Sequence, residues 1–150
     1  MIIGSSISGG GKSRNSMAEA ANIACDRMFD WQKKKWISTG IKEPAVFIST
    51  ELTKEEIQSC LLAHISGIEQ DRIEEWKDIT AEEEEILNQS AKIVEDSLLY
   101  GEYQPDFTID TISETIEQYI INHKIKYVFF EYINDSPSIY AYYFEKTKTR

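Results

Sequence analysis

The stretch SSISGGGKSRNS, residues 5 to 16, places three glycines directly before a lysine and a hydroxyl residue. The short apolar segment MIIG, residues 1–4, directly precedes it, and a segment rich in Ala and Met follows it from residue 17. This order predicts a strand, a glycine-rich turn and a helix, which is the context that a phosphate-binding loop requires. Glycines let backbone amides approach an anion closely, and the N-terminus of the helix adds partial positive charge. The stretch therefore predicts a loop that binds phosphate.

The predicted phosphate cradle contains a lysine and a serine with distinct chemical roles. Lys12 would reach the β- and γ-phosphates of a nucleotide, and the Ser13 hydroxyl would ligate Mg²⁺. The fit to the pattern G-x-x-x-x-G-K-[ST] is incomplete, because Ser6 stands at the first glycine position. The alternative is a flexible loop in which Gly-Lys-Ser occurs by chance, although strand, loop and helix agree on a cradle. The residues of the cradle are Ser8, Gly9, Gly10, Gly11, Lys12, Ser13 and Arg14.

The composition is that of one soluble domain of ordinary size. The chain has 150 residues, of which 41% are hydrophobic and 28% are charged. Its apolar runs are too short to span a bilayer, and its first residues do not have the pattern of a signal peptide. We therefore expect a cytoplasmic protein with no membrane partner. The formal net charge of −10 argues against a broad surface that binds nucleic acid.

Cysteine, histidine and lysine give no further site. Cys25 and Cys60 are expected to be small buried thiols within helices, and the spacing of cysteine and histidine does not suit a metal. His64 and His123 are expected on helices away from the phosphate loop. The lysines at 33–35 are interpreted as a solvated charge run. Positive charge also gathers at the end of the chain, on Lys146, Lys148 and Arg150.

Predicted helices and strands alternate along the chain. The first helix is expected from Ser13 to about Trp36, because apolar residues through Met28 and Trp31 keep helical spacing. Capping boxes at Thr53 and Thr80 mark two later helix starts. The further elements expected are strands over residues 44–49, 97–103 and 125–132, and helices over 53–67, 80–96 and 111–123. This alternation predicts an α/β layer fold with a mainly parallel sheet.

Three features fall at the carboxyl ends of predicted strands, where parallel sheets bind ligands. The first is the glycine-rich loop. The second is Glu51, which could activate water; the alternative is an exposed loop acid. The third is Glu131, which follows an apolar strand and could contact a metal ion through water. Together these features suit a nucleoside triphosphatase, which needs a phosphate cradle, a metal and a carboxylate.

Four segments in order carry a resemblance to a known family. They are residues 6–24 around the cradle, VFISTELTKEEIQSCLLAHISGI at 46–68, DRIEEW with the helix from Thr80, and FTIDTISETIEQYIINHKIKYVFFEYIN at 107–134. In these segments the chain resembles the ATPase domain of DnaB-type replicative hexameric helicases, which has the RecA-like P-loop NTPase fold of three layers. The resemblance implies Mg²⁺-ATP as the bound nucleotide, a hexamer, and DNA as a partner of the full-length protein.

The resemblance also assigns residues. Its S-x-E-[ML]-[ST] turn matches residues 49–53, so the catalytic glutamate of the family falls on Glu51. Its D-Y-[LI]-Q segment matches residues 131–134, with Glu131 in place of Asp and Asn134 in place of Gln. The chain then corresponds to the amino-terminal portion of one ATPase domain spanning 1–150, with a sheet incomplete at its C-terminus. Residues 136–150 are expected to be a flexible tail.

Two other functions remain open at this stage. One is a module that binds nucleotide without hydrolysing it, such as a helicase loader or a regulatory relative of the same fold. This reading is consistent with Glu131 and Asn134, which depart from the helicase pattern. The other is a recombinase or clock-type ATPase. The segment that follows Glu51 favours the helicase branch.

Overall fold

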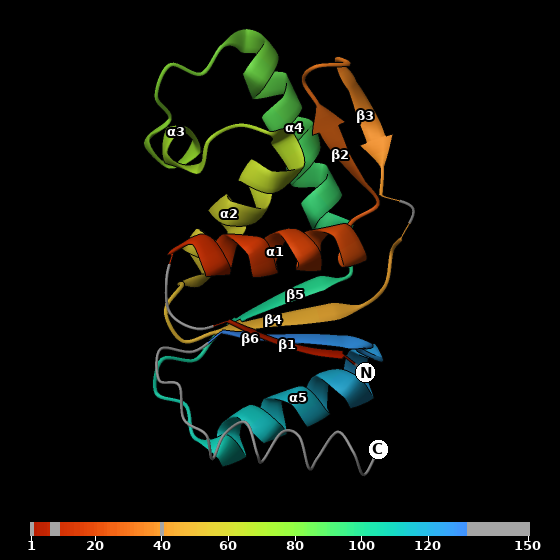
Figure 1. Ribbon diagram of the computed structural model, residues 1–150, viewed down its shortest axis with the longest axis vertical. Helices are drawn as coiled ribbons and strands as arrows, with labels where there is room; N and C mark the ends of the chain where they lie inside the picture. The colour runs from red at the N-terminus through yellow and green to blue at the C-terminus, as the bar shows by residue number, and fades with distance from the viewer. Residues whose placement is uncertain (1, 7–9, 40, 132–150) are drawn as a thin grey trace.

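A four-stranded parallel sheet forms the centre of the structure, a computed structural model that describes residues 2–6, 10–39 and 41–131. The strands stand in the order β1-β6-β4-β5 (Figure 1). Every neighbouring pair is parallel. The strands are β1 (Ile2–Ser6), β4 (Ala45–Ser49), β5 (Leu99–Tyr103) and β6 (Tyr127–Glu131). The strands predicted from the apolar runs are therefore confirmed.

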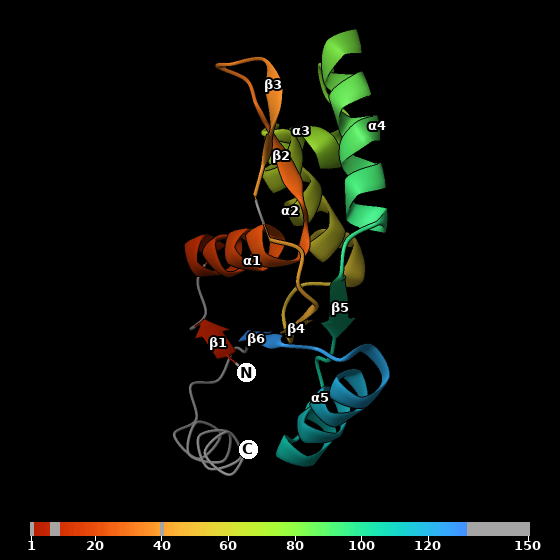
Figure 2. The same ribbon diagram turned by 90° about the vertical axis from the view of Figure 1, so that its right-hand side faces the viewer.

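Helices cover both faces of this sheet and complete three layers. Figure 1 and Figure 2 both place α1 on one side of the strands and α5 on the other. Helices α2 and α4 and the two-stranded antiparallel sheet β2-β3 lie on the α1 side, with α3 beyond them. The bounds are α1 (Gly10–Ala24), α2 (Lys54–Ser66), α3 (Gln70–Glu75), α4 (Ala81–Glu95), α5 (Ile109–His123), β2 (Arg27–Asp30) and β3 (Lys35–Ser38). Within the described residues, no helix combines the length and apolarity needed to cross a membrane.

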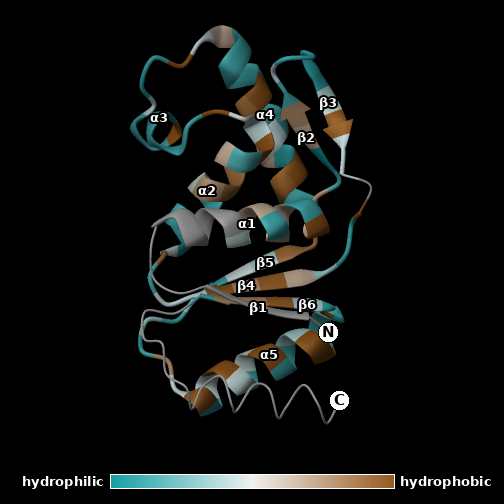
Figure 3. Cartoon of the chain, in the orientation of Figure 1, coloured by the Kyte–Doolittle hydropathy of each residue, from teal (hydrophilic) through white to brown (hydrophobic). Residues whose placement is uncertain are grey.

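The central strands are apolar on both faces because each face meets a helical layer. Phe47 of β4 and Phe129 of β6 belong to the cluster that includes α1 and α2. Val46 and Val128 belong to the cluster that includes Ile112 of α5. Figure 3 shows the hydrophobic colour of these strands between the two layers. The alternation of side chains along each strand thus divides the core into two clusters.

The helix predicted from Ser13 to Trp36 is wrong at both ends. The helix α1 begins at Gly10 and ends at Ala24, and the β2-β3 hairpin follows it. Met28 and Trp31 keep helical spacing with α1, but they lie on the hairpin. The turn of the hairpin is stabilised locally. The Asp30 carboxylate accepts hydrogen bonds from the backbone amides of Gln32 at 2.9 Å and Lys33 at 3.1 Å. Cys25, which we expected within the helix, is the first residue beyond it.

Threonine caps fix the start of the later helices. Thr80 forms the full capping box with Glu83 that the sequence predicts. Thr53 accepts the bond from the Glu56 amide, as predicted, but the Glu56 carboxylate contacts the Thr53 hydroxyl and not its amide. The last helix starts two residues before the predicted Thr111, with Thr108 as its cap. The short helix α3 at residues 70–75 lies between the predicted helices 53–67 and 80–96.

Gly67 ends α2 in a conformation that excludes larger residues. Its φ of 74° lies in the left-handed region, and its amide bonds to the carbonyl of Ala63. A Cβ at this position would lie 2.7 Å from Cδ1 of Trp31. The Trp31 indole is held in place, because Nε1 donates to the Ser66 carbonyl at 2.6 Å and Phe29 packs against the ring. The backbone conformation therefore favours glycine, and the contact with Trp31 excludes a larger residue.

We expect Gly67→Ala to lower the free energy of unfolding by about 2–4 kcal/mol, from the left-handed backbone and from the collision with Trp31. The matched control is Gly101→Ala, whose Cβ would meet Ile57 at 3.4 Å, an ordinary contact. That variant should stay within about 1 kcal/mol of the parent. Urea unfolding of the three proteins measures the difference. Equal stability of the two variants would contradict this account of Gly67.

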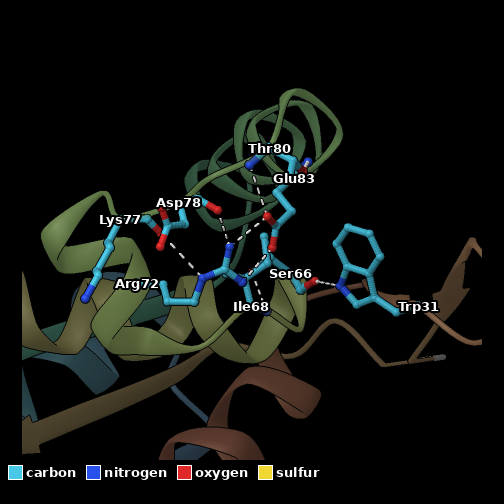
Figure 4. Close-up of polar contacts among 8 residues, drawn as sticks. All are labelled: Trp31, Ser66, Ile68, Arg72, Lys77, Asp78, Thr80 and Glu83. Atoms are coloured by element: carbon cyan, nitrogen blue, oxygen red, sulfur yellow. Dashed lines mark hydrogen bonds and ion pairs between the residues drawn. The ribbon is translucent and has the colours of Figure 1, made fainter.

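A bidentate ion pair ties α3 to α4. The guanidinium of Arg72 donates from Nη1 and Nη2 to the two carboxylate oxygens of Glu83, both at 2.8 Å. Nη2 also donates to the carbonyl of Asp78 at 2.6 Å, within the connection between the helices (Figure 4). Glu83 accepts a further bond from the Thr80 amide. The Arg72 guanidinium and these bonds hold the pKa of Glu83 at about 2, well below its ordinary value of 4.5.

This ion pair predicts a defined loss of stability in acid. Since the pKa of Glu83 is lower in the folded state, its contribution is complete above pH 4.5 and disappears as pH falls toward 2. Glu83→Gln should lower the urea midpoint at pH 7 by a few tenths of a molar and bring the midpoint closer to that of the parent at pH 3.

The control for this prediction is Glu84→Gln, which removes a neighbouring charge from the same first turn of α4. It should change the midpoint less than Glu83→Gln at pH 7. If the difference in urea midpoint between Glu83→Gln and the parent were the same at pH 7 and at pH 3, the Arg72–Glu83 ion pair would not be the source of the acid sensitivity.

Candidate functional site

The carboxyl ends of β1, β6 and β4 meet at one edge of the sheet. In the register of the strands, Glu131 is paired with Ser6 on one side and with Ser49 on the other. These are the last residues of their strands. The amide of Thr50 also donates to the Glu131 carbonyl at 3.1 Å, so the pairing extends into the turn that leads to Glu51. The fold thus brings together the three strand ends at which the sequence placed the functional residues.

The glycine-rich segment connects β1 to the first turn of α1. Gly10 and Gly11 open α1, and Lys12, Ser13 and Arg14 belong to its first turns. The predicted order of strand, turn and helix is therefore confirmed. Ser8 and Gly9 lie outside the described residues. The N-terminus of a helix of this length, directly after the carboxyl end of a parallel strand, is an arrangement that favours anions.

Glu131 is a carboxylate at the centre of this edge. Its side chain is 1% exposed, although it stands at a strand end. A buried carboxylate costs free energy unless other groups compensate it, so such a residue at the carboxyl end of a parallel sheet is a candidate for function. Carboxylate and hydroxyl oxygens are the ligands that Mg²⁺ prefers, so Glu131 and Ser13 have the donor chemistry for this ion.

Glu51 is carried by a turn that a buried serine organises. The Ser49 hydroxyl oxygen accepts hydrogen bonds from the amides of Glu51 at 3.2 Å and Leu52 at 2.8 Å. Leu52 packs against the core, and Thr53 then caps α2. The turn is therefore attached on both sides, while Glu51 itself stays partly exposed at the edge of the sheet. The fixed backbone on both sides thus sets the position of a partly exposed acidic residue at this edge.

Other polar residues lie away from this edge. His64 pairs with Asn22 through Nε2 at 3.0 Å, and burial lowers its pKa. His123 stacks on Tyr100, with ring centroids 4.3 Å apart. Cys25 and Cys60 are buried, as expected, and burial raises the pKa of the Cys25 thiol to about 11. Lysines 33–35 are exposed on the hairpin, where Lys34 pairs with Glu82 at 3.2 Å.

One residue at the edge was missed from the sequence. Gln104 follows β5 directly, and its amide donates to the Ser49 carbonyl at 2.8 Å. A polar residue just after the predicted strand 97–103 was the available signal. The predicted positions from Tyr132 to Asn134, the basic residues Lys146, Lys148 and Arg150, and the tail 136–150 lie outside the described residues.

A curated relative matches almost the whole chain. The SPbeta prophage-derived uncharacterized protein YorI of Bacillus subtilis strain 168 is 39% identical over 137 residues. The match covers 91% of this chain and 27% of YorI, so the chain spans about a quarter of the length of that relative. No protein-family model matches the chain.

Two solved structures share the fold at low sequence identity. A DnaB-like replicative helicase, described with its interactions with primase, aligns with a TM-score of 0.62 at 14% identity over 87% of this chain and 28% of its own. The ATPase domain of G40P aligns with a TM-score of 0.63 at 13% identity over 91% of this chain and 45% of its own. The chain therefore has the α/β, RecA-like fold of the ATPase domains of DnaB-like replicative helicases, as the sequence resemblance predicted.

Proposed function

We propose that the chain is an ATP-binding and ATP-hydrolysing motor domain of a DnaB-like replicative DNA helicase. The observation that carries the proposal is the common register of Ser6, Glu131 and Ser49, which puts the glycine-rich loop, a buried carboxylate and the Glu51 turn at one edge. The fold shared with helicase ATPase domains supports the same class of function. In this proposal the chain acts in the cytoplasm.

The glycine-rich loop and the start of α1 bind the phosphates in this proposal. The backbone amides of Gly9–Gly11 and the helix N-terminus would bind the phosphate oxygens, together with Ser8 and Arg14. Lys12 would neutralise charge on the β- and γ-phosphates. The Ser13 hydroxyl and Glu131 would hold Mg²⁺. The ion, when bound, supplies charge neutralisation on the phosphates during transfer.

Glu51 is the proposed catalytic base. Its turn stands beside the end of β6, and the residue is partly exposed. From this position it orients water and accepts a proton as the water attacks the γ-phosphate, so that ADP and phosphate are the products. In the full-length protein, hydrolysis drives strand unwinding of DNA by a hexamer. These partners follow from the likeness to replicative helicases.

A second function is a nucleotide-binding module without turnover, such as a helicase loader or a regulatory relative. Glu131 favours it, because the helicase pattern has aspartate at this position and the added methylene changes the reach toward a metal ion. Both functions require the phosphate cradle. They differ in whether Glu51 takes part in hydrolysis. The phosphate cradle is therefore tested with Lys12, and hydrolysis is tested separately with Glu51.

Lys12→Ala should weaken the binding of Mg²⁺-ATP by about a hundredfold, because a charge-assisted contact to the phosphates is lost. Calorimetric titration of the parent and the variant measures this directly. The control is Lys33→Ala, which removes one positive charge from the exposed hairpin and should leave the affinity unchanged. Equal affinity in Lys12→Ala, with a cooperative thermal melt, would rule out the proposed cradle.

Glu51→Gln should keep ATP affinity within about threefold and lower the hydrolysis rate by about a hundredfold or more. The variant has nearly the same shape but no longer accepts a proton. Hydrolysis is measured with and without single-stranded DNA, and Glu55→Gln on the exposed start of α2 is the matched control. Binding without hydrolysis in the parent would favour the non-catalytic module, and hydrolysis without DNA stimulation would count against a helicase.

A further inference from the structure

A series of hydrogen bonds connects α5 to the turn that carries Glu51. Gln104 is at its centre, just beyond the end of β5. Its backbone amide donates to the Ser49 carbonyl at 2.8 Å, and its side-chain Nε2 donates to the Thr115 hydroxyl at 2.7 Å. Thr115 is on α5, which lies on the face of the sheet opposite α1. Gln104 thus bonds both to the end of β4 and to α5.

The bonds around Thr115 fix the orientation of the Gln104 amide. The Thr115 hydroxyl has one proton, which it donates to the carbonyl of Thr111 at 2.9 Å. Its oxygen must therefore act as an acceptor toward Gln104, which places the amide NH₂ against it. Within the described residues, the remaining Gln104 oxygen is buried without a hydrogen-bond partner. An unpaired buried acceptor costs free energy. The bonds that Gln104 makes to Thr115 and to Ser49 must offset the cost of its unpaired oxygen.

Ser49 continues the series on the side of the sheet edge. Its backbone carbonyl receives the Gln104 amide, while its hydroxyl oxygen receives the amides of Glu51 and Leu52. Ser49 is completely buried and is paired with Glu131 in the register of the sheet. The backbone position of this one residue therefore sets where the Glu51 turn stands relative to Glu131.

We propose that Ser49 and Gln104 are positioning residues for Glu51, and that the Thr115–Gln104–Ser49 bonds couple α5 to this turn. The inference rests on the proposed function, because it assigns Glu51 a chemical task. Neither residue touches a reacting atom. Ser49 holds the turn directly, and Gln104 holds Ser49 from the α5 side. A change in the position of α5 is transmitted to the turn through these bonds.

The first test measures amide hydrogen exchange and needs no nucleotide. Gln104→Met removes the side-chain amide and keeps the backbone bond to Ser49, while Thr115→Val removes the hydroxyl at similar volume. Both should accelerate exchange of the Glu51 and Leu52 amides by about threefold or more, relative to the Ile57 amide of α2. Ser49→Ala, which removes the acceptor itself, should accelerate it by about tenfold.

The matched control is Glu114→Gln. It changes the charge of an exposed residue next to Thr115 on the same helix and leaves the Thr115–Gln104 bond intact. Exchange at Glu51 and Leu52 should not respond to this variant. Unchanged exchange in Gln104→Met and Thr115→Val, or equal acceleration in Glu114→Gln, would overturn the coupling.

The second test separates positioning from general stability. Gln104→Met should lower kcat for ATP hydrolysis by about tenfold and leave KM within about twofold, because the nucleotide cradle is unaltered. Ser49→Ala combined with Gln104→Met should lose less than the sum of the single effects, since both act on one turn. Normal kcat with accelerated exchange would overturn the positioning role. A parent that binds no ATP would refute the proposed function, while the exchange test still decides the coupling.

Discussion

The parallel pairing of β6 between β1 and β4 is the constraint on which the rest of the structure depends. This strand pairs on both of its edges, and because a helical layer covers each face of the sheet, its side chains are apolar toward both layers. A slip of one residue would turn Phe129 and Phe130 to the wrong clusters. The register that the core requires is also the register that aligns Glu131 with Ser6 and Ser49. Packing and the candidate site therefore have a common origin.

Features with local causes could be predicted from the sequence. The apolar run at 44–49 and the capping box at Thr80 depend on neighbours within a few residues, and both are confirmed. The β2-β3 hairpin could not be predicted in this way, because the apolar residues of this segment also have the spacing of a helix. Contacts with residues distant in the sequence stabilise the hairpin, including the hydrogen bonds from Trp31 to Ser66 and from Trp36 to Gln89. Such contacts have no signature in a local window.

The same distinction applies to the candidate site. Glu51 and Glu131 could be placed at one edge because the rule for parallel sheets concerns strand ends and not strand order. Gln104 could not, since its bond to Ser49 requires that β5 be the neighbour of β4. That adjacency depends on the strand order β1-β6-β4-β5, which the alternation of helices and strands leaves open. The sequence thus predicts which strand ends are functional, and the fold determines which residues support them.

The glutamate at position 131 is physically reasonable in this setting. Its cross-strand neighbours are Ser6 and Ser49, and Ser49 is itself fully buried. The burial of Glu131 would be costly in isolation, but α1 begins soon after the neighbouring strand β1, and the N-terminus of a helix favours negative charge. The departure from aspartate thus changes the distance from the backbone to the carboxylate while its charge stays at the edge where the glycine-rich segment begins.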